Sequence, residues 1–474
     1  MYDVVIIGAG IVGTMLARDL SRYRLKVALI DKENDIADGA TMANSAIVHT
    51  GYDPEDNTMK AKMNVAGAKL YPSICKDLHC AYKVIGAYVA AVDEEEEAHQ
   101  YVLAARAERR GIPYAFLSGE EARKEEPNLN ESITRVLSFP TTAIIYPWEV
   151  AIACAQVAVN NRTDLFLNTE CRDIKRTADG YTVITDNQDM ETRIVINASG
   201  IGAEHIYSMV GKPNFHITPR KGEYFVIDQS ADFVHHVVFP VPSSKGKGVL
   251  AVPTVYGNTL LGPNSDYVSG TIDTGDTFQG LDYVRDNINR TMKSVPMNKV
   301  IRTFAGLRPS SSSSDFIIEE AADAPGFINA ASIESPGLAS APGISRYIID
   351  EILKDRLILE ENPEAVMTRP APVVMKDLNN EERQEMIRKN PAYGRIICRC
   401  EQISEGEIID CIRAVCGARS VKGVKKRVRP GMGRCQGGFC EPRVVEILAR
   451  ELHITPMEVV LDSKKSEIIE KENR

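Results

Sequence analysis

The sequence contains no apolar run of the roughly 18 residues that a transmembrane helix needs. It also lacks an excess of positive charge, because 56 Lys and Arg residues stand against 65 Asp and Glu residues, a net charge of −9. This balance argues against a general nucleic-acid-binding protein. No internal repeat or low-complexity tract is present, and a hydrophobic content of 44% with 26% charged residues excludes disordered and fibrous classes.

A secretory signal is also missing, since the chain opens on an apolar segment and its first basic residue is Arg18. We therefore expect a cytoplasmic protein. The ten cysteines of such a protein indicate reduced thiols or metal ligands rather than a disulfide framework. At about 150 residues per domain, the length of 474 residues predicts roughly three domains.

The first 31 residues follow a pattern typical of dinucleotide binding. Residues 2–7 predict a buried parallel strand, a helix follows to about Tyr23, and residues 25–31 predict a second strand ending in Asp31. Gly8, Gly10 and Gly13 lie between the first strand and the helix. These glycines permit a tight turn, a close approach to a pyrophosphate and close helix packing, respectively. The helix N-terminus offers N–H groups to the anion, and Asp31 can accept hydrogen bonds from ribose hydroxyls.

The glycine motif alone does not separate FAD from NAD, but three later segments favour FAD. Residues 39–51, with Asn44 and Ser45, are small and polar and suit a chain that runs along a flavin. Residues 195–202 predict a second strand followed by a turn at Gly200. Residues 335–343 place backbone amides at a helix start, where N–H groups stabilise the negative charge of a reduced flavin. The candidates in this last segment are Ser335, Gly337 and Leu338.

Two kinds of sheet are predicted further along the chain. Strands are expected at 84–92, at 133–139, three times within 164–198 with a turn at Asp179-Gly180, repeatedly within 215–262, and at 325–332. The short strands of 215–262 are separated by Gly, Pro and Ser turns and predict an antiparallel sheet. Helices are expected at 93–111, 147–160 and 342–355, and a short one at 379–389.

Five stretches resemble the FAD-dependent oxidoreductases of the D-amino-acid-oxidase and glycerol-3-phosphate dehydrogenase superfamily. They are similar above all to glycerol-3-phosphate oxidases and L-2-hydroxyglutarate oxidases, and they follow the order of that family over residues 1–355. The stretches are NSAIVHTGYDP (44–54), RKGEYFVID (220–228), GKGVLAVPT (246–254), FAGLRPSSSSSDFII (304–318) and ESPGLASAPGIS (334–345). Asp31 departs from the more usual Glu of the family, a change that a shorter carboxylate should tolerate.

The resemblance implies a substrate site beside the flavin. His49 matches the histidine regarded as the catalytic base, and an imidazole that titrates near neutrality suits removal of a hydroxyl proton. Arg308 and Lys247 match positions that contact the anionic group of the substrate. On the residues alone, His49 could be structural, Arg308 a structural salt-bridge residue and Lys247 a solvated loop lysine. Ser335 is a further candidate hydrogen-bond donor to substrate or flavin, and the serine run 310–314 is interpreted as a polar loop.

Four cysteines near the C-terminus form a second candidate site. Cys398 and Cys400 are separated from Cys435 and Cys440 by a basic stretch, and four thiolates can hold a metal or an iron–sulfur cluster. A capping box at Ser404–Glu407 and Pro442 predict helix starts close to both pairs. Zinc is the general alternative, usually with C-x2-C spacing. The spacing here, with MGRCQGGFC (432–440), resembles the [2Fe–2S] domain related to bacterioferritin-associated ferredoxin. Cys75, Cys80, Cys154, Cys171, Cys411 and Cys416 are expected to be buried core thiols.

The expected fold is an α/β and α+β multidomain protein: a Rossmann-like FAD-binding domain interleaved with an antiparallel-sheet substrate domain, followed by a small helical iron–sulfur domain. Residues 1–80, 147–210 and 300–358 are assigned to the FAD-binding domain, and 81–146 and 211–299 to the substrate domain. A linker or surface-wrapping segment follows at 359–393, then the [2Fe–2S] domain at 394–455 and a tail at 456–474.

These predictions together describe a dehydrogenase that oxidises a small anionic 2-hydroxy compound, in the first place sn-glycerol 3-phosphate to dihydroxyacetone phosphate. FAD accepts the hydride, and the electrons leave through the [2Fe–2S] cluster to an electron-accepting protein partner. Two alternatives stay open. One is an oxidase or dehydrogenase for L-2-hydroxyglutarate or an amino acid on the same scaffold. The other is a non-catalytic flavin redox subunit, which should lack His49, Lys247 and Arg308.

Overall fold

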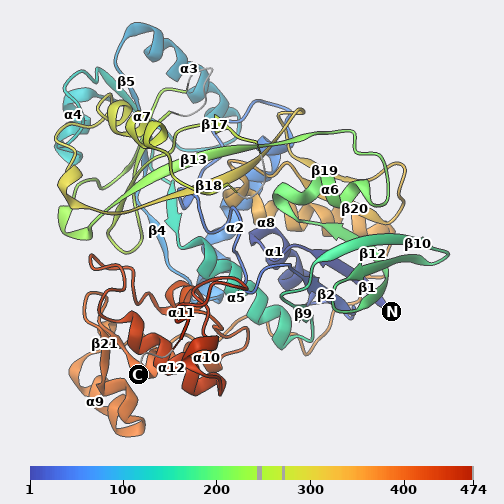
Figure 1. Cartoon of the computed structure of the whole chain (residues 1–474). Coiled ribbons are helices and arrows are strands. Elements are labelled where there is room, and N and C mark those ends of the chain that lie inside the picture. Colours follow the sequence, from blue (N-terminus) through green and yellow to red (C-terminus); the bar gives the residue numbers. More distant parts are fainter. Residues whose placement is uncertain (243–247, 270–272, 472–474) are drawn as a thin grey trace.

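The computed structural model describes residues 1–242, 248–269 and 273–471. Two large sheets lie side by side, and a compact group of C-terminal helices packs below them (Figure 1). The multidomain α/β and α+β fold predicted from the sequence is confirmed. No helix of the described residues has the length and apolar character required to span a membrane.

An eight-stranded sheet contains the N-terminal strand. Five of its strands run parallel. The central ones are largely buried, as the continuous apolar runs of their sequences require, whereas the edge strand β9 is partly exposed. In spatial order the main path is β10 (Cys171–Thr177), β11 (Gly180–Thr185), β12 (Asp189–Asn197), β1 (Tyr2–Ile7), β2 (Val27–Ile30) and β9 (Asp164–Phe166). β20 (Phe327–Ala331) pairs with β12, and β19 (Ile317–Glu320) pairs with β20. The segment predicted to hold three strands therefore holds four, because the short β9 precedes the β10–β11–β12 meander.

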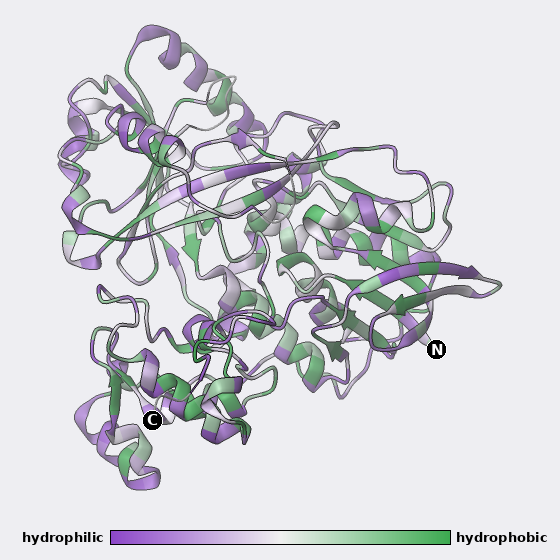
Figure 2. Ribbon diagram, in the orientation of Figure 1, coloured by the Kyte–Doolittle hydropathy of each residue, from purple (hydrophilic) through white to green (hydrophobic). Residues whose placement is uncertain are grey.

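Helices cover this sheet and supply its core. α1 (Ile11–Leu20) packs against α5 (Pro147–Asn160) and α8 (Gly337–Tyr347), and α8 packs against α2 (Met59–Asp77). Apolar residues concentrate in these strands and in the helices packed against them (Figure 2). α6 (Ala203–Ser208) follows the turn after β12.

α8 begins at Gly337, five residues before the helix start predicted from the sequence. The prediction placed Pro342 at the start of the helix, whereas the structure places it inside. A proline has no N–H for the carbonyl four residues before it, here that of Leu338. The Tyr71 hydroxyl on α2 donates to this carbonyl oxygen instead, at 2.6 Å. A tertiary contact thus satisfies the group that the proline leaves unpaired, and a rule of local sequence could not show it.

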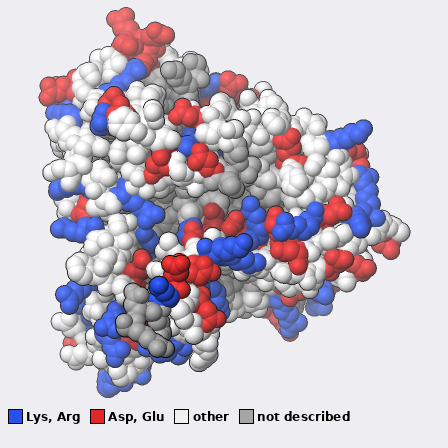
Figure 3. Space-filling view, in the orientation of Figure 1, with Lys and Arg blue, Asp and Glu red and all other residues white. Residues whose placement is uncertain are grey.

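The second sheet has nine strands and is antiparallel except where β14 runs parallel to β5. Its strands are β17 (Asp266–Tyr267), β13 (Ile217–Ile227), β16 (Thr259–Gly262), β15 (Leu250–Pro253), β14 (Val237–Pro240), β5 (Ala87–Ala91), β7 (Arg135–Phe139) and β6 (Ala115–Ser118), with β18 (Val300–Ser311) paired to β13. α3 (Glu94–Arg109), α4 (Gly119–Glu125) and α7 (Phe278–Ile288) pack at its outer end. In Figure 3 acidic side chains gather at the top of the molecule, over α3, whose first turn contains four glutamates.

β18 belongs to a different sheet from the one that the predicted domain boundaries assigned to it. Residues from 300 onward were assigned to the FAD-binding domain, but β18 pairs along its whole length with β13 in the nine-stranded sheet. The chain returns to the eight-stranded sheet only at β19. A small three-stranded sheet of β3 (Ile47–Val48), β8 (Ala143–Ile145) and β4 (Tyr82–Val84) lies where the two large sheets meet.

The segment 359–393 runs over the surface of the helices of the first sheet. Its backbone bonds to Arg24 and to the Asn161 side chain, and Arg369 donates to the carbonyl oxygen of Leu78. It ends in α9 (Asn380–Lys389), which matches the short helix predicted there. The C-terminal helices are α10 (Glu405–Arg413), α11 (Val421–Val428) and α12 (Glu441–Leu452), beside the short strands β21 (Ile396–Cys398) and β22 (Ile403–Ser404). The predicted capping box at Ser404 and Pro442 in the first turn of α12 are both confirmed.

Candidate functional site

A cavity of about 2610 Å³ lies between the two large sheets and reaches the C-terminal helices. Its wall contains most of the site residues predicted from the sequence: Gly8, Gly10, Asp31, Asn44, Ser45, His49, Gly200, Arg308, Ser335, Gly337 and Leu338. Gly13 is not on the wall and acts through packing. Lys247 lies outside the described residues.

The glycine turn after β1 is fixed by close backbone approaches. Gly8 has a positive φ of 110°, and a Cβ there would lie 2.4 Å from the carbonyl oxygen of Ala198. A Cβ on Gly13 would lie 1.9 Å from the carbonyl oxygen of Gly8, so α1 packs against the turn only with glycine at this position. The loop that follows β2 also supports the turn, since Thr41 Oγ1 accepts the Ile11 N–H at 3.0 Å.

Asp31 lies at the end of β2 on the cavity wall. Its carboxylate accepts the N–H groups of Ala9 at 2.6 Å and Glu33 at 2.9 Å. Burial raises the pKa of Asp31 to about 6, although these two hydrogen bonds lower it. The side chain is therefore held in position and is poised to change charge just below neutral pH.

Polar groups on the cavity wall fit a large polar cofactor. α1 and α8 both begin at the wall, and their N-cap residues, Gly10 and Pro336, make no side-chain capping bond. Apart from the Ile11 N–H, which Thr41 accepts, this leaves N-terminal backbone groups available to an anion. Buried wall atoms without a hydrogen-bond partner in the described parts of the chain include Trp148 Nε1, Arg220 Nε and Thr254 Oγ1. A dinucleotide such as FAD supplies acceptors and donors of this kind, and the cavity is large enough to hold it.

His49 directly follows β3, and its side chain is nearly buried, with 9% exposure. Its carbonyl oxygen accepts the Asn64 amide of α2 at 2.6 Å, and its ring lies 5.6 Å from the ring of Phe239. Ser45, four residues earlier, is within 3.0 Å of the Tyr224 hydroxyl of β13. This part of the wall therefore combines a nearly buried imidazole with the hydroxyl groups of Ser45, in the loop before β3, and Tyr224, on β13.

Arg308 and Arg220 are cross-strand partners on β18 and β13, and both reach the cavity. Arg308 Nη2 donates to the carbonyl oxygens of Lys221 at 3.0 Å and Asn264 at 2.7 Å, so its described hydrogen bonds use backbone groups rather than a carboxylate. Gly222 makes room for it, since a Cβ there would lie 2.4 Å from Arg308 Nη2. Two guanidinium groups side by side provide the positive charge that an anionic substrate requires.

Arg220 and Tyr224 were not among the predicted site residues. Arg220 donates to Glu334, which also binds Lys60 at 2.7 Å. The alternation of side chains between the two faces of a strand could have indicated both residues from the sequence. Positions 220, 222 and 224 share one face of β13, and that face lines the cavity.

The four C-terminal cysteines come together as two pairs. Cys400 Sγ lies 3.7 Å from Cys435 Sγ, and Cys398 shares a hydrogen bond with Cys440. This bond lowers the pKa of Cys398 and raises that of Cys440. Burial and the neighbouring Cys435 raise the pKa of Cys400. The charge of Cys398 raises it further, so the ionisation of one pair affects the pKa of the other. Among the residues that the structure describes, no group of three or more His, Cys, Asp or Glu side chains is gathered closely enough for one metal ion. Two pairs of thiols suit a [2Fe–2S] cluster, which takes four cysteine ligands.

The other cysteines are remote from this arrangement. Cys75, Cys80, Cys154, Cys171 and Cys411 are buried, and Cys416 is partly buried. Burial raises the pKa of each of these thiols, as expected for core residues that stay protonated.

Comparisons with known proteins match both the two-sheet part of the chain and the C-terminal domain. Residues 3–351 match the model of the FAD dependent oxidoreductase family, and residues 396–450 match that of the BFD-like [2Fe-2S] binding domain. The chain is 43% identical to glycerol 3-phosphate dehydrogenase of Caloramator mitchellensis over 99% of its own length and 98% of that protein. It is 32% identical to glycerol 3-phosphate oxidase of Mycoplasma pneumoniae, over 73% of this chain and 93% of that one. A solved structure of dithionite-reduced L-α-glycerophosphate oxidase from Mycoplasma pneumoniae with FAD bound superposes with a TM-score of 0.75 at 30% identity, covering 79% of this chain and 99% of that chain.

Proposed function

The chain belongs to the FAD dependent oxidoreductase family, and from this premise we propose that it oxidises sn-glycerol 3-phosphate to dihydroxyacetone phosphate. Its cofactors are FAD and a [2Fe–2S] cluster. The observation that carries the choice of substrate is the 43% identity to a glycerol 3-phosphate dehydrogenase over nearly the whole of both chains. That similarity includes the C-terminal domain, which a match to the FAD-binding part alone would not.

The proposed chemistry assigns roles to the cavity residues. His49 takes the proton of the substrate hydroxyl, because an imidazole is neutral and basic near pH 7. Arg308, with Arg220 beside it, neutralises the phosphate group. The family resemblance assigns Lys247 to the same task. FAD, when bound, accepts the hydride from the alcohol carbon. Asp31 and the glycines after β1 hold the ribose and pyrophosphate, and the α8 amides near Ser335, Gly337 and Leu338 face the flavin end.

The four cysteines provide the way out for the electrons. We assign Cys398, Cys400, Cys435 and Cys440 as the cluster ligands, since they are the thiols that the fold brings into pairs next to helix starts. Oxidising a secondary alcohol to a ketone releases two electrons, whereas a [2Fe–2S] cluster carries one at a time. The proposed acceptor is therefore an external protein that takes single electrons.

An anaerobic titration tests the substrate assignment. We expect glycerol 3-phosphate to bleach the flavin absorbance, and L-2-hydroxyglutarate and amino acids to leave it unchanged. Bleaching by one of those compounds, with none by glycerol 3-phosphate, would replace the proposed substrate with its rival on the same scaffold. No bleaching by any of them, in protein that holds FAD, would favour a non-catalytic redox subunit.

The base is tested by His49→Asn. We expect the rate of flavin bleaching by glycerol 3-phosphate to fall by about 10²–10⁴, with FAD still bound. His216→Asn is the matched control, because His216 lies exposed and away from the cavity wall. Equal losses in both variants would contradict the role of His49.

A further inference from the structure

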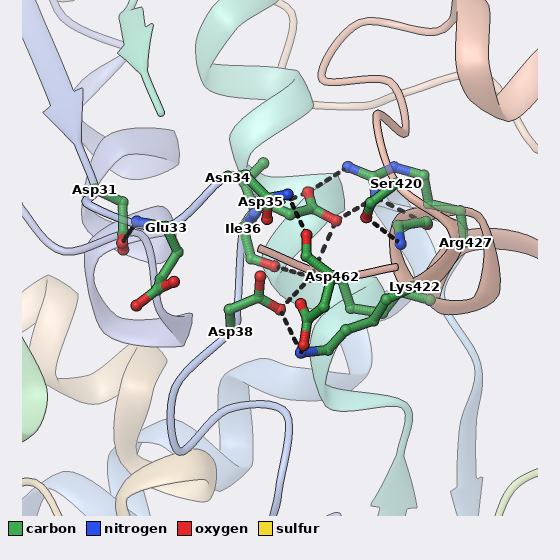
Figure 4. A network of polar contacts seen from close by, with 12 residues as sticks. Asp31, Glu33, Asn34, Asp35, Ile36, Asp38, Ser420, Lys422, Arg427 and Asp462 are labelled. Atoms are coloured by element: carbon green, nitrogen blue, oxygen red, sulfur yellow. Dashed lines mark hydrogen bonds and ion pairs between the residues drawn. The ribbon is translucent and has the colours of Figure 1, made fainter. Parts of the chain in front are cut away.

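The C-terminal domain is seated on the rest of the chain by a set of buried ion pairs. Arg427 of α11 binds Asp35, in the loop after β2 (Figure 4). Lys426 of the same helix binds both Asp35 and Asp38. Arg427 makes a two-pronged contact with Asp35, both distances being 2.8 Å. The docking surface is therefore the same loop that begins at Asp31 and ends at Thr41, on the cofactor cavity.

Arg429 makes a different contact two residues later. It ends α11 with a positive φ of 72° and is 7% exposed. Its Nε donates to Glu401 at 2.8 Å, and its Nη1 donates to the Tyr146 hydroxyl at 3.0 Å. The guanidinium carbon lies 3.9 Å from the ring centroid of Tyr256, in the β15–β16 hairpin. One side chain thus joins the C-terminal domain to both other parts of the molecule.

The partners of Arg429 lead directly to the two cofactor sites. Glu401 follows Cys400 in sequence, and Tyr146 lines the large cavity. The Tyr146 ring lies 4.3 Å from that of Trp148, whose indole N–H is one of the cavity atoms without a partner in the described structure. Arg429 itself also lines the cavity. The contact is therefore the place where the cysteine site and the cavity wall share a side chain.

We propose that Arg429 is the positioning residue that holds the iron–sulfur domain against the cavity wall, and that electrons cross from FAD to the cluster at its contact with Tyr146 and Tyr256. The inference rests on the proposed function, because it needs substrate electrons to reach the flavin. In each turnover two electrons leave the alcohol carbon and pass singly across this contact. They go to the external one-electron acceptor, and the two protons leave to water. A guanidinium suits the position because it stays charged when buried and can bond to two partners while stacking on a ring.

The test uses two conservative variants of the loaded enzyme. Arg429→Lys keeps a cation for Glu401 but loses the planar stack, and Tyr256→Leu removes the ring without changing the iron–sulfur domain. After rapid anaerobic mixing with glycerol 3-phosphate, we expect the flavin to bleach in both variants, and at the unaltered rate in Tyr256→Leu, because Tyr256 is not part of the cavity wall in the described structure. The electron paramagnetic resonance signal of the reduced cluster should appear at least about tenfold more slowly in both variants. Arg443→Gln, on an exposed pair with Glu446, is the matched control and should behave as the unaltered protein.

A second measurement reports docking without turnover. We expect faster amide deuterium exchange at residues 253–258 and 421–432 in both variants, and none of this in the control. The cluster signal after dithionite treatment checks that each variant is fully loaded. Cluster reduction at the unaltered rate in both loaded variants would overturn the proposal. If glycerol 3-phosphate fails to reduce the unaltered protein, the proposed function fails instead. Photoreduction of the flavin then supplies the electrons for the same comparison.

Discussion

The glycine site at the N-terminus and the cysteine site at the C-terminus are built by opposite means. The first is formed by backbone against backbone: Gly13 against Gly8, and Gly8 against Ala198, leave no space for a single carbon atom. The second is formed by side chains, and its four sulfurs lie as two pairs. A thiolate in one pair raises the pKa in the other, because like charges repel. The fold alone completes the first site, while the second needs its metal to hold the thiolates together.

The two sites also differ in what surrounds them. The glycine turn belongs to the core of the eight-stranded sheet, with buried strands on both sides. The cysteines belong to a small domain whose own core is limited to short helices and two short strands. A small domain of this kind gains much of its stability from metal ligation and from docking. Damage to the glycine turn should therefore affect the whole molecule, whereas damage to the cysteines should stay local.

Gly13→Ala should have the largest effect. A Cβ at this position would lie 1.9 Å from a backbone oxygen, so α1 or the turn has to move. We expect a loss of at least about 4 kcal/mol in the free energy of unfolding, together with loss of FAD. Thermal unfolding and flavin absorbance measure the two effects. Gly39→Ala is the matched control, because a Cβ there meets no atom within 4 Å. A Gly13→Ala variant that retains FAD would show that the turn is less rigid than the structure indicates.

Cys435→Ser should separate the two regions. We expect loss of the visible and paramagnetic bands of the cluster and fast deuterium exchange across 396–450. FAD should stay bound, and the exchange of 2–351 should change only where the C-terminal domain docks, at 31–41 and 253–258. Removal of iron with a chelator should reproduce this result in the unaltered protein. Cys411→Ala is the control, since it removes a buried thiol outside the two pairs and should keep the cluster. A variant that loses both cofactors would contradict the separation.

Arg427→Gln tests how the regions are joined. Removing the Arg427 guanidinium takes away both of its hydrogen bonds to buried Asp35 and leaves Lys426 as the carboxylate's cation. We expect a cost of at least about 2 kcal/mol to docking, measured as faster deuterium exchange over 421–428. Burial raises the pKa of Asp35, but Arg427 and Lys426 outweigh this and hold the pKa below its usual range. Docking should therefore be stable above about pH 4 and be lost as the carboxylate is protonated in stronger acid. Lys389→Gln, on an exposed pair, should change exchange by less than the measurement error.

The sequence predicted the glycine turn and the helix starts near the cysteines, because these depend on short-range patterns. Eleven of the residues that line the cavity were also among its candidates, and His49 and Arg308 came from the family resemblance. The sequence could not predict that β18 pairs with β13 in the nine-stranded sheet, because an apolar pattern identifies a strand but not the strand with which it pairs. It also missed Arg429 as a joint between domains. The basic stretch from Lys422 to Arg434 reads as solvated charge, and only the fold shows that Lys426 and Arg429 are buried against acidic and aromatic partners.

Asp31→Asn gives the smallest effect and sharpens the account of the glycine site. Because the folded protein without FAD raises the pKa of Asp31 to about 6, it binds this proton more tightly than the unfolded chain does. Its stability should therefore rise as pH falls from 6 towards 4, by about 2 kcal/mol, and be lost again as pH rises. The amide introduced by the substitution cannot ionise, so the variant without FAD should lose this pH dependence. Its single oxygen can accept only one of the two backbone N–H groups, of Ala9 and Glu33, that the carboxylate accepts. Its affinity for FAD should fall roughly tenfold, because the ribose loses a charged acceptor. Thermal unfolding at pH 5 and 7.5, with and without FAD, measures all of these changes, and identical pH profiles for the two proteins would contradict the assigned role of Asp31.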